Sequence, residues 1–302
     1  MIKKISLFAT VFLVLTAMTV SSVSGITYYL SDGYLYRDIT QNTIALSGYQ
    51  GSDTQLVVPE TIGERTVISI DSYAFYGNST VTDIDLSQAK GLSAIGEGAF
   101  CECSSLKNAV IPSTVNLISE MAFQDCSLLE AVQFDATVNK INRQMFMRCS
   151  ALKRFSVPET VSSILDYAFA NCSSLEQIVI PSSVTSISDV AFLNDNNLTI
   201  YGFADSYAQT YAQEHNIPFV EMVKFLLGDV DGVDGVNIND VTAIQSHLAE
   251  LKTVEGVYLL AADANQDDIV DISDATAIQM KLAEYVLPYP IGQYVTKEIV
   301  SE

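Results

Sequence analysis

Basic side chains are scarce in this sequence. It holds 15 Lys and Arg against 36 Asp and Glu, which gives 302 residues a formal net charge of -21. So large an acidic excess repels a phosphate backbone and excludes nucleic acid as an expected partner. The acids are unevenly spread, because residues 225–285 carry twelve of them and only two lysines. This local excess indicates a segment that binds a cation.

Familiar catalytic motifs are also missing. The chain has no G-x-S-x-G, no H-E-x-x-H and no glycine-rich phosphate loop. We therefore expect no enzyme activity. A glycoside hydrolase stays open as an alternative, because any two Asp or Glu residues about 5 to 10 Å apart can serve as its acid and nucleophile.

Long apolar runs are absent except at the N-terminus. Lys3 and Lys4 precede an apolar stretch, Ile5–Val20, and small residues follow as far as Gly25. This order is typical of a secretory signal peptide, and the stretch is shorter than the ~20 residues of a spanning helix. We predict that residues 1–25 are a signal peptide, and that the secreted protein has no membrane span after cleavage.

Phenylalanine recurs at a fixed interval through the middle of the chain. Four of the five gaps are 23 residues and one is 25. The members are Phe75, Phe100, Phe123, Phe146, Phe169 and Phe192. An Ile lies five positions before each, and from Phe100 onward a Leu lies six positions after. Such self-similarity predicts a solenoid in which every repeat is one coil.

Each of those leucines is followed by a short alternating stretch such as Glu176–Pro181, whose period of two predicts a strand. The unit I-x-x-x-A-F-x-x-C-x-x-L-x-x-(V/I)-x-(I/F)-P resembles the BspA-like, or Treponema-type, leucine-rich repeats over roughly residues 55–220. The resemblance implies a leucine-rich-repeat solenoid, and it makes a cell-surface or host adhesin an alternative function.

Open ends of a solenoid need covers. We predict an N-terminal cap hairpin over residues 26–54, with a turn at Ser31–Gly33, and repeats with a helical C-terminal cap over residues 55–220.

Four of the five cysteines share the repeat spacing of 23 residues. They are Cys103, Cys126, Cys149 and Cys172. This column predicts buried, reduced thiols stacked beside the phenylalanines, since free Cys is among the most buried residue types. A metal or redox ladder is the alternative, but both histidines lie outside the repeats. Cys101 breaks the column, and we expect it to be the most exposed thiol.

The strand period also predicts a strip of outward side chains along the repeats. Its ten members are Asp83, Asp85, Asn108, Val110, Ala131, Gln133, Arg154, Ser156, Gln177 and Val179. The strip has mixed polarity and no aromatic residue on which a sugar ring would stack. A protein ligand, or none, is favoured over a polysaccharide.

Two C-terminal segments match at an offset of 34 residues. Asp240–Glu250 and Asp274–Glu284 share the pattern D-x-T-A-I-Q-x-x-L-A-E, and an acidic loop of twelve residues precedes each. The apolar pair Ile244 and Leu248 marks one face of a helix in the first segment. The segments therefore predict a tandem pair of loop-helix units.

The loops place oxygen-bearing residues at positions where EF-hands bind calcium, which takes six to eight oxygen ligands. The second loop supplies side chains at positions 1, 3, 5, 9 and 12 and a backbone carbonyl at position 7. Its ligands would be Asp263, Asn265, Asp267, Ile269, Asp271 and Asp274. Position 6, usually Gly, is Asp268, which tolerates a left-handed backbone.

The first loop has Val233 at position 5 and so lacks one ligand. If the backbone adjusts, Asp234 replaces it; otherwise the site is weaker. Its ligands would be Asp229, Asp231, Asp234, Asn237 and Asp240. We predict two calcium ions, with the second loop the better site.

Paired units of this kind resemble the type I-like dockerins of cellulosomes over residues 225–290, with residues 291–302 left as a C-terminal tail. The resemblance implies a small three-helix module that binds a cohesin domain of a scaffoldin in a calcium-dependent way. The implied contacts are Asn239, Val241, Thr242, Gln245, Ser246 and His247, with Ser273, Ala275, Thr276, Gln279, Met280 and Lys281 in the second copy.

The sequence thus predicts an α+β chain of several domains, a leucine-rich-repeat solenoid followed by a small all-α calcium-binding dockerin. The expected function is that of a secreted, non-catalytic, cellulosome-bound protein whose repeats hold a protein or surface ligand. A cellulosomal hydrolase subunit for polysaccharide degradation is the alternative from the enzyme class.

Overall fold

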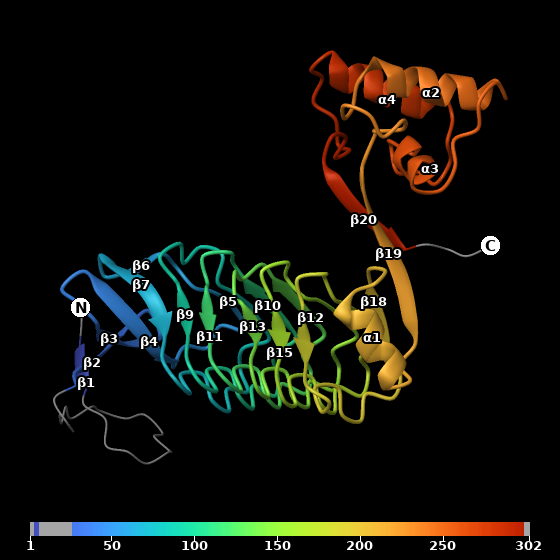
Figure 1. Cartoon of the computed structure of the whole chain (residues 1–302). Coiled ribbons are helices and arrows are strands. Elements are labelled where there is room, and N and C mark those ends of the chain that lie inside the picture. Colours follow the sequence, from blue (N-terminus) through green and yellow to red (C-terminus); the bar gives the residue numbers. More distant parts are fainter. Residues whose placement is uncertain (1–2, 6–25, 299–302) are drawn as a thin grey trace. The chain divides into compact units, whose positions relative to one another are not determined.

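The computed structural model describes residues 3–5 and 26–298. The chain divides into two compact units, residues 1–219 and 220–302 (Figure 1). The predicted signal peptide lies outside the described residues except for β1 (Lys3–Ile5), which pairs with β2. Among the residues that the structure describes, no helix has the length and apolar content to span a bilayer.

An antiparallel meander opens the first unit. It consists of β2 (Tyr28–Ser31), β3 (Tyr34–Asp38) and β4 (Thr43–Tyr49), so the segment contains three strands rather than a hairpin. β4 runs parallel to β7 (Arg65–Ile70) of the first coil, and β6 (Thr61–Ile62) pairs with β7 from the other side. Tyr36 and Leu46 are fully buried against the first coil, so the meander covers this end of the solenoid core.

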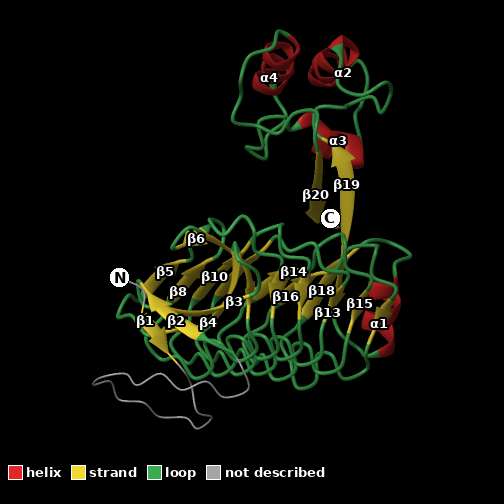
Figure 2. Ribbon diagram, turned by 90° about the vertical axis from the view of Figure 1, so that its left-hand side faces the viewer, coloured by secondary structure: helices red, strands yellow, loops and turns green. Residues whose placement is uncertain are grey.

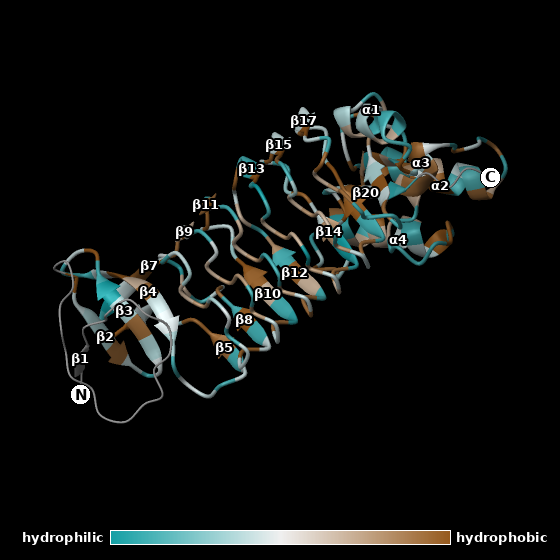
Figure 3. Cartoon of the chain, turned by 90° about the horizontal axis from the view of Figure 1, so that it is seen from below, coloured by the Kyte–Doolittle hydropathy of each residue, from teal (hydrophilic) through white to brown (hydrophobic). Residues whose placement is uncertain are grey.

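The solenoid carries two rows of parallel strands, which lie along its opposite edges in Figure 3. The first row contains β5 (Gln55–Val57), β8 (Asp83–Asp85), β10 (Asn108–Ile111), β12 (Ala131–Phe134), β14 (Arg154–Ser156), β16 (Gln177–Val179) and β18 (Thr199–Gly202). The second, shorter row contains β9 (Ala94–Ile95), β11 (Leu117–Ile118), β13 (Lys140–Ile141), β15 (Ser163–Ile164) and β17 (Ser186–Ile187). Figure 2 shows the turns that connect the rows.

The phenylalanine column forms the centre of the solenoid core, as the spacing predicts. All six rings are buried, and successive rings stack with centroids 5.0 to 5.6 Å apart. Full burial of one such ring contributes roughly 1.5 to 3 kcal/mol to folding.

The cysteine column lies beside the rings, and the prediction that its thiols are buried is confirmed. A feature that the sequence did not show is the role of each thiol as a donor. Cys103, Cys126, Cys149 and Cys172 each donate to the carbonyl of the phenylalanine one coil earlier, at 3.0 to 3.1 Å. Cys101 is the most exposed of the five thiols, as expected, but at 5% it is still buried, and burial raises its pKa to about 11.

Five of the six coils turn through left-handed backbone on both sides of the phenylalanine, and the coil of Phe192 does so only after it, at Asn194. Around Phe123 these residues are Met121, with φ 58°, and Asp125, with φ 61°. Their N–H groups donate to carbonyls of the following coil, from Met121 to Arg143 at 3.0 Å and from Asp125 to Met147 at 2.9 Å. The turns are therefore held by hydrogen bonds between coils. The sequence does not reveal these left-handed positions, because most of the residues that occupy them are not glycine.

Both strand rows are interrupted between the same two coils. Backbone pairing is absent between β12 and β14 and between β11 and β13 in the described residues. At this boundary Phe134 and Phe155 replace the aliphatic residues of other coils, and their centroids lie 5.3 Å apart. The two adjacent rings coincide with the break in the strand rows, while the turns of the same coils stay hydrogen-bonded to each other. The buried Asn142 side chain spans the gap, since its Nδ2 donates to the Ile118 carbonyl at 2.6 Å.

Helix α1 (Tyr207–Glu214) closes the far end of the repeats. Ser206 caps it by accepting from the Gln209 N–H, and Tyr211 packs on Phe192 with centroids 6.0 Å apart. The helix thus covers the last ring of the phenylalanine column.

The second unit is mainly helical and has its own core. It contains α2 (Ile238–Leu248), α3 (Val257–Ala262) and α4 (Ile272–Leu282), and α2 packs against α4 through buried residues that include Ile244 and Ile278. The expectation of an all-α unit needs one correction. β19 (Phe219–Leu226) and β20 (Tyr294–Glu298) form an antiparallel ribbon from residues that looked like a connector and a tail.

Candidate metal centre

Helices α2 and α4 begin with the same capping box. Asn237 caps α2 and Asp271 caps α4, and an Asp at the third helical position, Asp240 or Asp274, accepts in return from the cap backbone. Asp240 also accepts from the Val230 N–H at 2.7 Å, and it is completely buried. The last residue of the loop therefore ties the start of the loop to the start of the helix.

The second copy repeats this arrangement. Asp274 accepts from the backbone N–H groups of Asn265 at 3.0 Å and Asp271 at 2.9 Å. Burial raises the pKa of both Asp240 and Asp274, against the lowering effect of these hydrogen bonds. A bound cation would favour the charged carboxylates that burial disfavours.

Left-handed residues bend both loops at positions 4 and 6. Gly232 and Asp234 have φ of 72° and 60°, and Gln266 and Asp268 have 60° and 66°. The expectation that Asp268 adopts the glycine conformation at position 6 is confirmed. The two loops therefore share left-handed backbone at both positions, with Asp at position 6 in each and Gly232 against Gln266 at position 4; the first loop has a further left-handed residue, Gly235, at position 7.

Three carboxylates of the first loop converge. One oxygen from each of Asp229, Asp231 and Asp240 lies within 4.8 Å of the other two. Asp234 is exposed and does not join this triad. Asn237 directs its Nδ2 to the Gly235 carbonyl at 2.8 Å, so its amide supports the loop backbone. The triad is a set of hard oxygen donors that could hold a metal ion, which fits calcium better than a soft metal.

Side chains of the second loop accept hydrogen bonds from their own backbone, as Asp229, Asp231 and Asn237 do in the first loop. Asn265 and Asp267 accept from the N–H groups two residues on, Asp271 accepts from Ser273, and Ile269 is 61% exposed. With an amide at position 3 instead of a carboxylate, this loop forms no triad like that of the first loop. The sequence ranked the second loop as the better site, but the structure brings the carboxylates together in the first.

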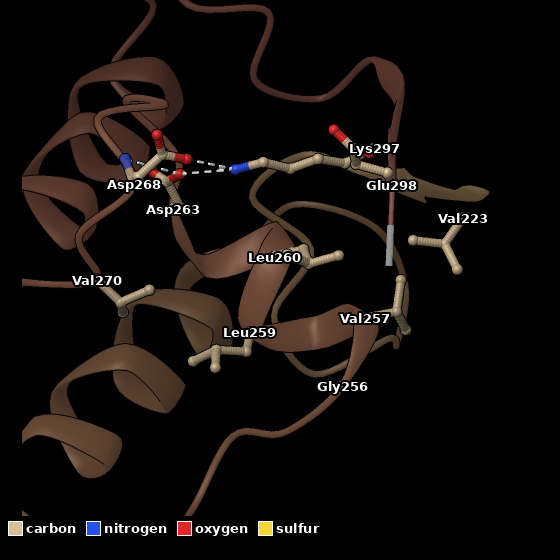
Figure 4. Close-up of a pocket in the computed structure, with 10 residues that line it drawn as sticks. All are labelled: Val223, Gly256, Val257, Leu259, Leu260, Asp263, Asp268, Val270, Lys297 and Glu298. Atoms are coloured by element: carbon tan, nitrogen blue, oxygen red, sulfur yellow. Dashed lines mark hydrogen bonds and ion pairs between the residues drawn. The ribbon is translucent and has the colours of Figure 1, made fainter. Parts of the chain in front are cut away.

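A lysine from the ribbon contacts the second loop. Lys297 of β20 places its Nζ 2.7 Å from Asp268 Oδ1 and 3.6 Å from Asp263 Oδ2 (Figure 4). Its ammonium lowers the pKa of Asp268. Negative charge at loop positions 1 and 6 is thus partly neutralised from within the chain.

Beside this ion pair lies a cavity of about 890 Å³, lined largely by apolar side chains. Val223 of β19 and Val257, Leu259 and Leu260 of α3 form much of its wall (Figure 4). It belongs entirely to the second unit.

The residues implied as partner contacts divide into two groups. Val241 and Ala275 are 2% and 1% exposed and belong to the core, so they leave the candidate contact surface. His247 is half-buried, and its Nδ1 accepts from the Val254 N–H at 3.1 Å. The exposed residues are Asn239, Thr242, Gln245, Ser273, Thr276, Gln279, Met280 and Lys281, and Ser246 is half-buried.

The outward strip of the first strand row is as predicted. None of its ten side chains is buried, and the alternate residues, such as Ile178 and Phe155, belong to the core. The sequence overlooked its aromatic end, where Tyr201 of β18 lies beside Val179 and accepts a hydrogen bond from Gln177 at 3.0 Å.

Comparison with known proteins agrees with the repeat architecture. A family model described as the BspA type leucine-rich-repeat region matches residues 68–199 in six copies. No curated protein matches the chain.

Similar folds occur among solved structures. The leucine-rich-repeat protein of T. pallidum is 22% identical with a TM-score of 0.54, covering 63% of this chain and 96% of its own. A leucine-rich-repeat protein from Eubacterium ventriosum is 23% identical with a TM-score of 0.50, covering 57% of this chain and 44% of its own. A leucine-rich cell surface protein from Faecalibacterium prausnitzii is 28% identical with a TM-score of 0.45, covering 66% and 44%.

This chain therefore spans less than half the length of the last two proteins, and the family match ends before the second unit begins. Residues 68–199 thus match the BspA type leucine-rich-repeat model, solved leucine-rich-repeat proteins share the fold of the repeats, and a small helical unit follows them in this chain.

Proposed function

We propose that this chain is an extracellular, non-catalytic binding protein whose second unit is a calcium-dependent docking module of the dockerin type. The observation that carries the proposal is the duplicated loop-helix unit, in which Asp240 and Asp274 occupy equivalent buried cap positions. Two such copies packed through α2 and α4 present a pair of similar helix surfaces to a partner. The signal-peptide pattern of residues 1–25 supports export.

Calcium would be held first by Asp229, Asp231 and Asp240, whose carboxylate oxygens already converge. The ion would neutralise mutual repulsion among these groups and fix the loop against the start of α2. Asp263, Asn265, Asp267, Asp271 and Asp274 offer oxygens for a second ion, in competition with Lys297 at Asp263. Calcium binding would thus set the geometry of both helices.

The partner would be a cohesin domain, which would contact the exposed polar faces of α2 and α4. Thr242 and Gln245 on α2 have equivalents in Thr276 and Gln279 on α4, and all four are exposed. The repeats would add a second binding surface for a protein or cell-surface ligand. Their polar, solvent-facing strand row supports this role, since repeat solenoids commonly bind through such extended surfaces.

Docking can be tested by titrating the chain, without residues 1–25, against a panel of cohesins with calcium or with a chelator. We expect at least one saturable complex that forms only with calcium. Replacing Thr242, Gln245, Thr276 and Gln279 together by Arg should weaken it about a hundredfold, because unpaired charges bury badly at an interface.

A matched variant that changes exposed Thr40, Gln88, Thr185 and Gln213 of the first unit to Arg should bind cohesin normally. Failure of every cohesin to bind the calcium-loaded chain would refute the docking role even if calcium itself binds.

A further inference from the structure

Two exposed tyrosines stand together on the turns of the first coil. Tyr73 and Tyr76 are 47% and 48% exposed, and their rings meet edge to face with centroids 6.1 Å apart. The Tyr73 ring lies over the next coil, where a Cβ on Gly98 would come within 2.4 Å of it. The pair therefore holds a defined position, and Gly98 provides the space for it.

Acidic side chains border this pair. The Tyr73 hydroxyl donates to Glu97 Oε1 at 2.7 Å, and the neighbouring Glu102 side chain raises the pKa of Tyr76. Nearby arginines are already engaged, because Arg148 pairs with Asp125 and Arg143 with Asp166. Within the part of the chain that the structure describes, Glu97 and Glu102 form no ion pair.

The backbone at Tyr73 does not favour tyrosine. Its φ is 58°, in the left-handed region where Gly, Asn and Asp are least costly, and Gly98 occupies the equivalent turn of the next coil. Met121, Gln144 and Tyr167 hold the same turn with the same left-handed backbone in later coils, so this conformation belongs to the repeat. What distinguishes Tyr73 is its contact with a second exposed tyrosine, Tyr76, together with its hydrogen bond to Glu97.

We propose that Tyr73, Tyr76, Glu97 and Glu102 form a receptor for a Lys or Arg side chain on a basic segment of a partner protein. The aromatic faces attract the cation, and the two carboxylates pair with it. Charge complementarity favours this occupant, because Arg148 is the arginine beside Glu102 and its own ion pair is with Asp125, which leaves the surface around Glu97 and Glu102 with an acidic excess. The proposal rests on the protein-binding role of the repeats but not on docking by the second unit.

The test uses the chain without residues 1–25, at physiological salt and with calcium present to occupy the second unit. A short fluorescein-labelled peptide of alternating Arg and Val serves as the probe, and fluorescence anisotropy reports binding. A peptide with citrulline in place of Arg keeps the shape and removes the charge. We expect saturable binding of the Arg peptide and about tenfold weaker binding of the citrulline peptide.

Two double variants remove the two halves of the receptor. Tyr73→Asn with Tyr76→Ser removes the rings and places at position 73 a residue that suits its backbone, and Glu97→Gln with Glu102→Gln removes the charges. Each should weaken the Arg peptide about tenfold. The matched control, Glu130→Gln with Glu176→Gln, changes as much charge at exposed positions beside the first strand row and should bind as the wild type does.

Equal weakening by the control variant would show general charge attraction and overturn the receptor. So would unchanged binding by either receptor variant, or no saturable binding by the wild type. Thermal unfolding of each variant checks that the repeats remain folded, and cohesin binding measured on the same samples separates this outcome from a failure of docking.

Discussion

Asp195 occupies the column position that cysteine fills in the four preceding coils. It is 8% exposed, and neither of its carboxylate oxygens has a hydrogen-bond partner among the described residues. Burial raises its pKa to about 7. In the coil before, Cys172 donates to the Phe146 carbonyl at 3.1 Å. A protonated Asp195 can act in the same way toward Phe169, whereas a carboxylate cannot donate.

The stability of the repeats should therefore depend on the pH. Because the folded pKa of Asp195 is raised above its unfolded value of 3.8, its contribution is complete below pH 3.8 and is lost as the pH rises to about 7. Asp195→Asn removes this titration and retains a donor. Compared with the wild type, the variant should gain stability between pH 4 and 7, by at most about 4 kcal/mol at 1.4 kcal/mol per unit.

Thermal unfolding of both proteins across this range measures the difference. Cys172 and Tyr211 face the same region, but neither thiol nor phenol titrates in that window, because burial raises the pKa of both. If the difference in stability between the wild type and Asp195→Asn does not change with pH, Asp195 ionises freely in the folded protein.

Asn142 carries a second prediction at this scale. Its side chain is the donor to the buried Ile118 carbonyl where the second strand row is interrupted. Asn142→Ala leaves that carbonyl without a partner and should cost about 1 to 3 kcal/mol of unfolding free energy. The exposed Asn139→Ala, three residues earlier, serves as the control and should change stability by less than about 0.5 kcal/mol. Urea unfolding followed by circular dichroism compares them, and equal losses would contradict the role of Asn142.

At the scale of elements, the sequence predicts those coils and strands whose buried side chains recur at a fixed spacing. The Phe and Ile spacing locates each coil, and the alternation after each Leu locates the first strand row, because burial of side chains sets both patterns. Backbone hydrogen bonds produce no such pattern of residue types in the sequence. The left-handed turns, the interrupted rows near Phe134 and Phe155 and the β19–β20 ribbon were therefore missed. The ribbon pairs Met222 with Glu298, which are far apart in sequence.

At the candidate metal site, too, the sequence predicts some features and only the folded structure shows the others. Loop spacing identified both acidic loops, but it could not show which carboxylates converge, nor that Lys297 reaches Asp263 from β20. Residue type ranked the second loop above the first, whereas three carboxylates converge in the first loop, so the order of the two sites stays a prediction to be measured. Val241 and Ala275 illustrate a related limit. The resemblance to dockerins implied that both contact a partner, but both side chains are buried in the core of the second unit.

The order of the two loops can be measured directly, and the convergence of the first-loop carboxylates predicts that the first loop is the tighter site. Asp229→Asn and Asp263→Asn each change position 1 of one loop. Loss of Asp229 breaks the triad, while loss of Asp263 removes a group already contacted by Lys297. Asp229→Asn should therefore lower the calcium affinity of the tighter site by roughly tenfold or more, and Asp263→Asn should leave that site nearly unchanged. Calorimetric titration of calcium into each variant decides between them, and a larger loss from Asp263→Asn would restore the ranking made from the sequence.

At the scale of the whole molecule, the two units differ in how they resist unfolding. The core of the first unit extends from the N-terminal meander to α1 and is stacked around six phenylalanines. The core of the second unit has 13 buried residues, five of them alanine. Twelve acids accompany this small core between residues 225 and 285. Charge repulsion therefore weighs more heavily on the second unit than on the first.

Removal of calcium should unfold the second unit and spare the repeats. A ligand that binds only the folded state at a hundred times its Kd adds about 2.7 kcal/mol, a large share of the stability of so small a core. Calorimetry of the chain with calcium should show two transitions, and a chelator should lower only the one that belongs to the second unit. The double variant Asp229→Asn with Asp263→Asn should make that transition insensitive to calcium. If the chelator moves both transitions together, or neither, the second unit does not owe its fold to the ion, because the carboxylates of Asp229, Asp231 and Asp240 would then be tolerated side by side without it.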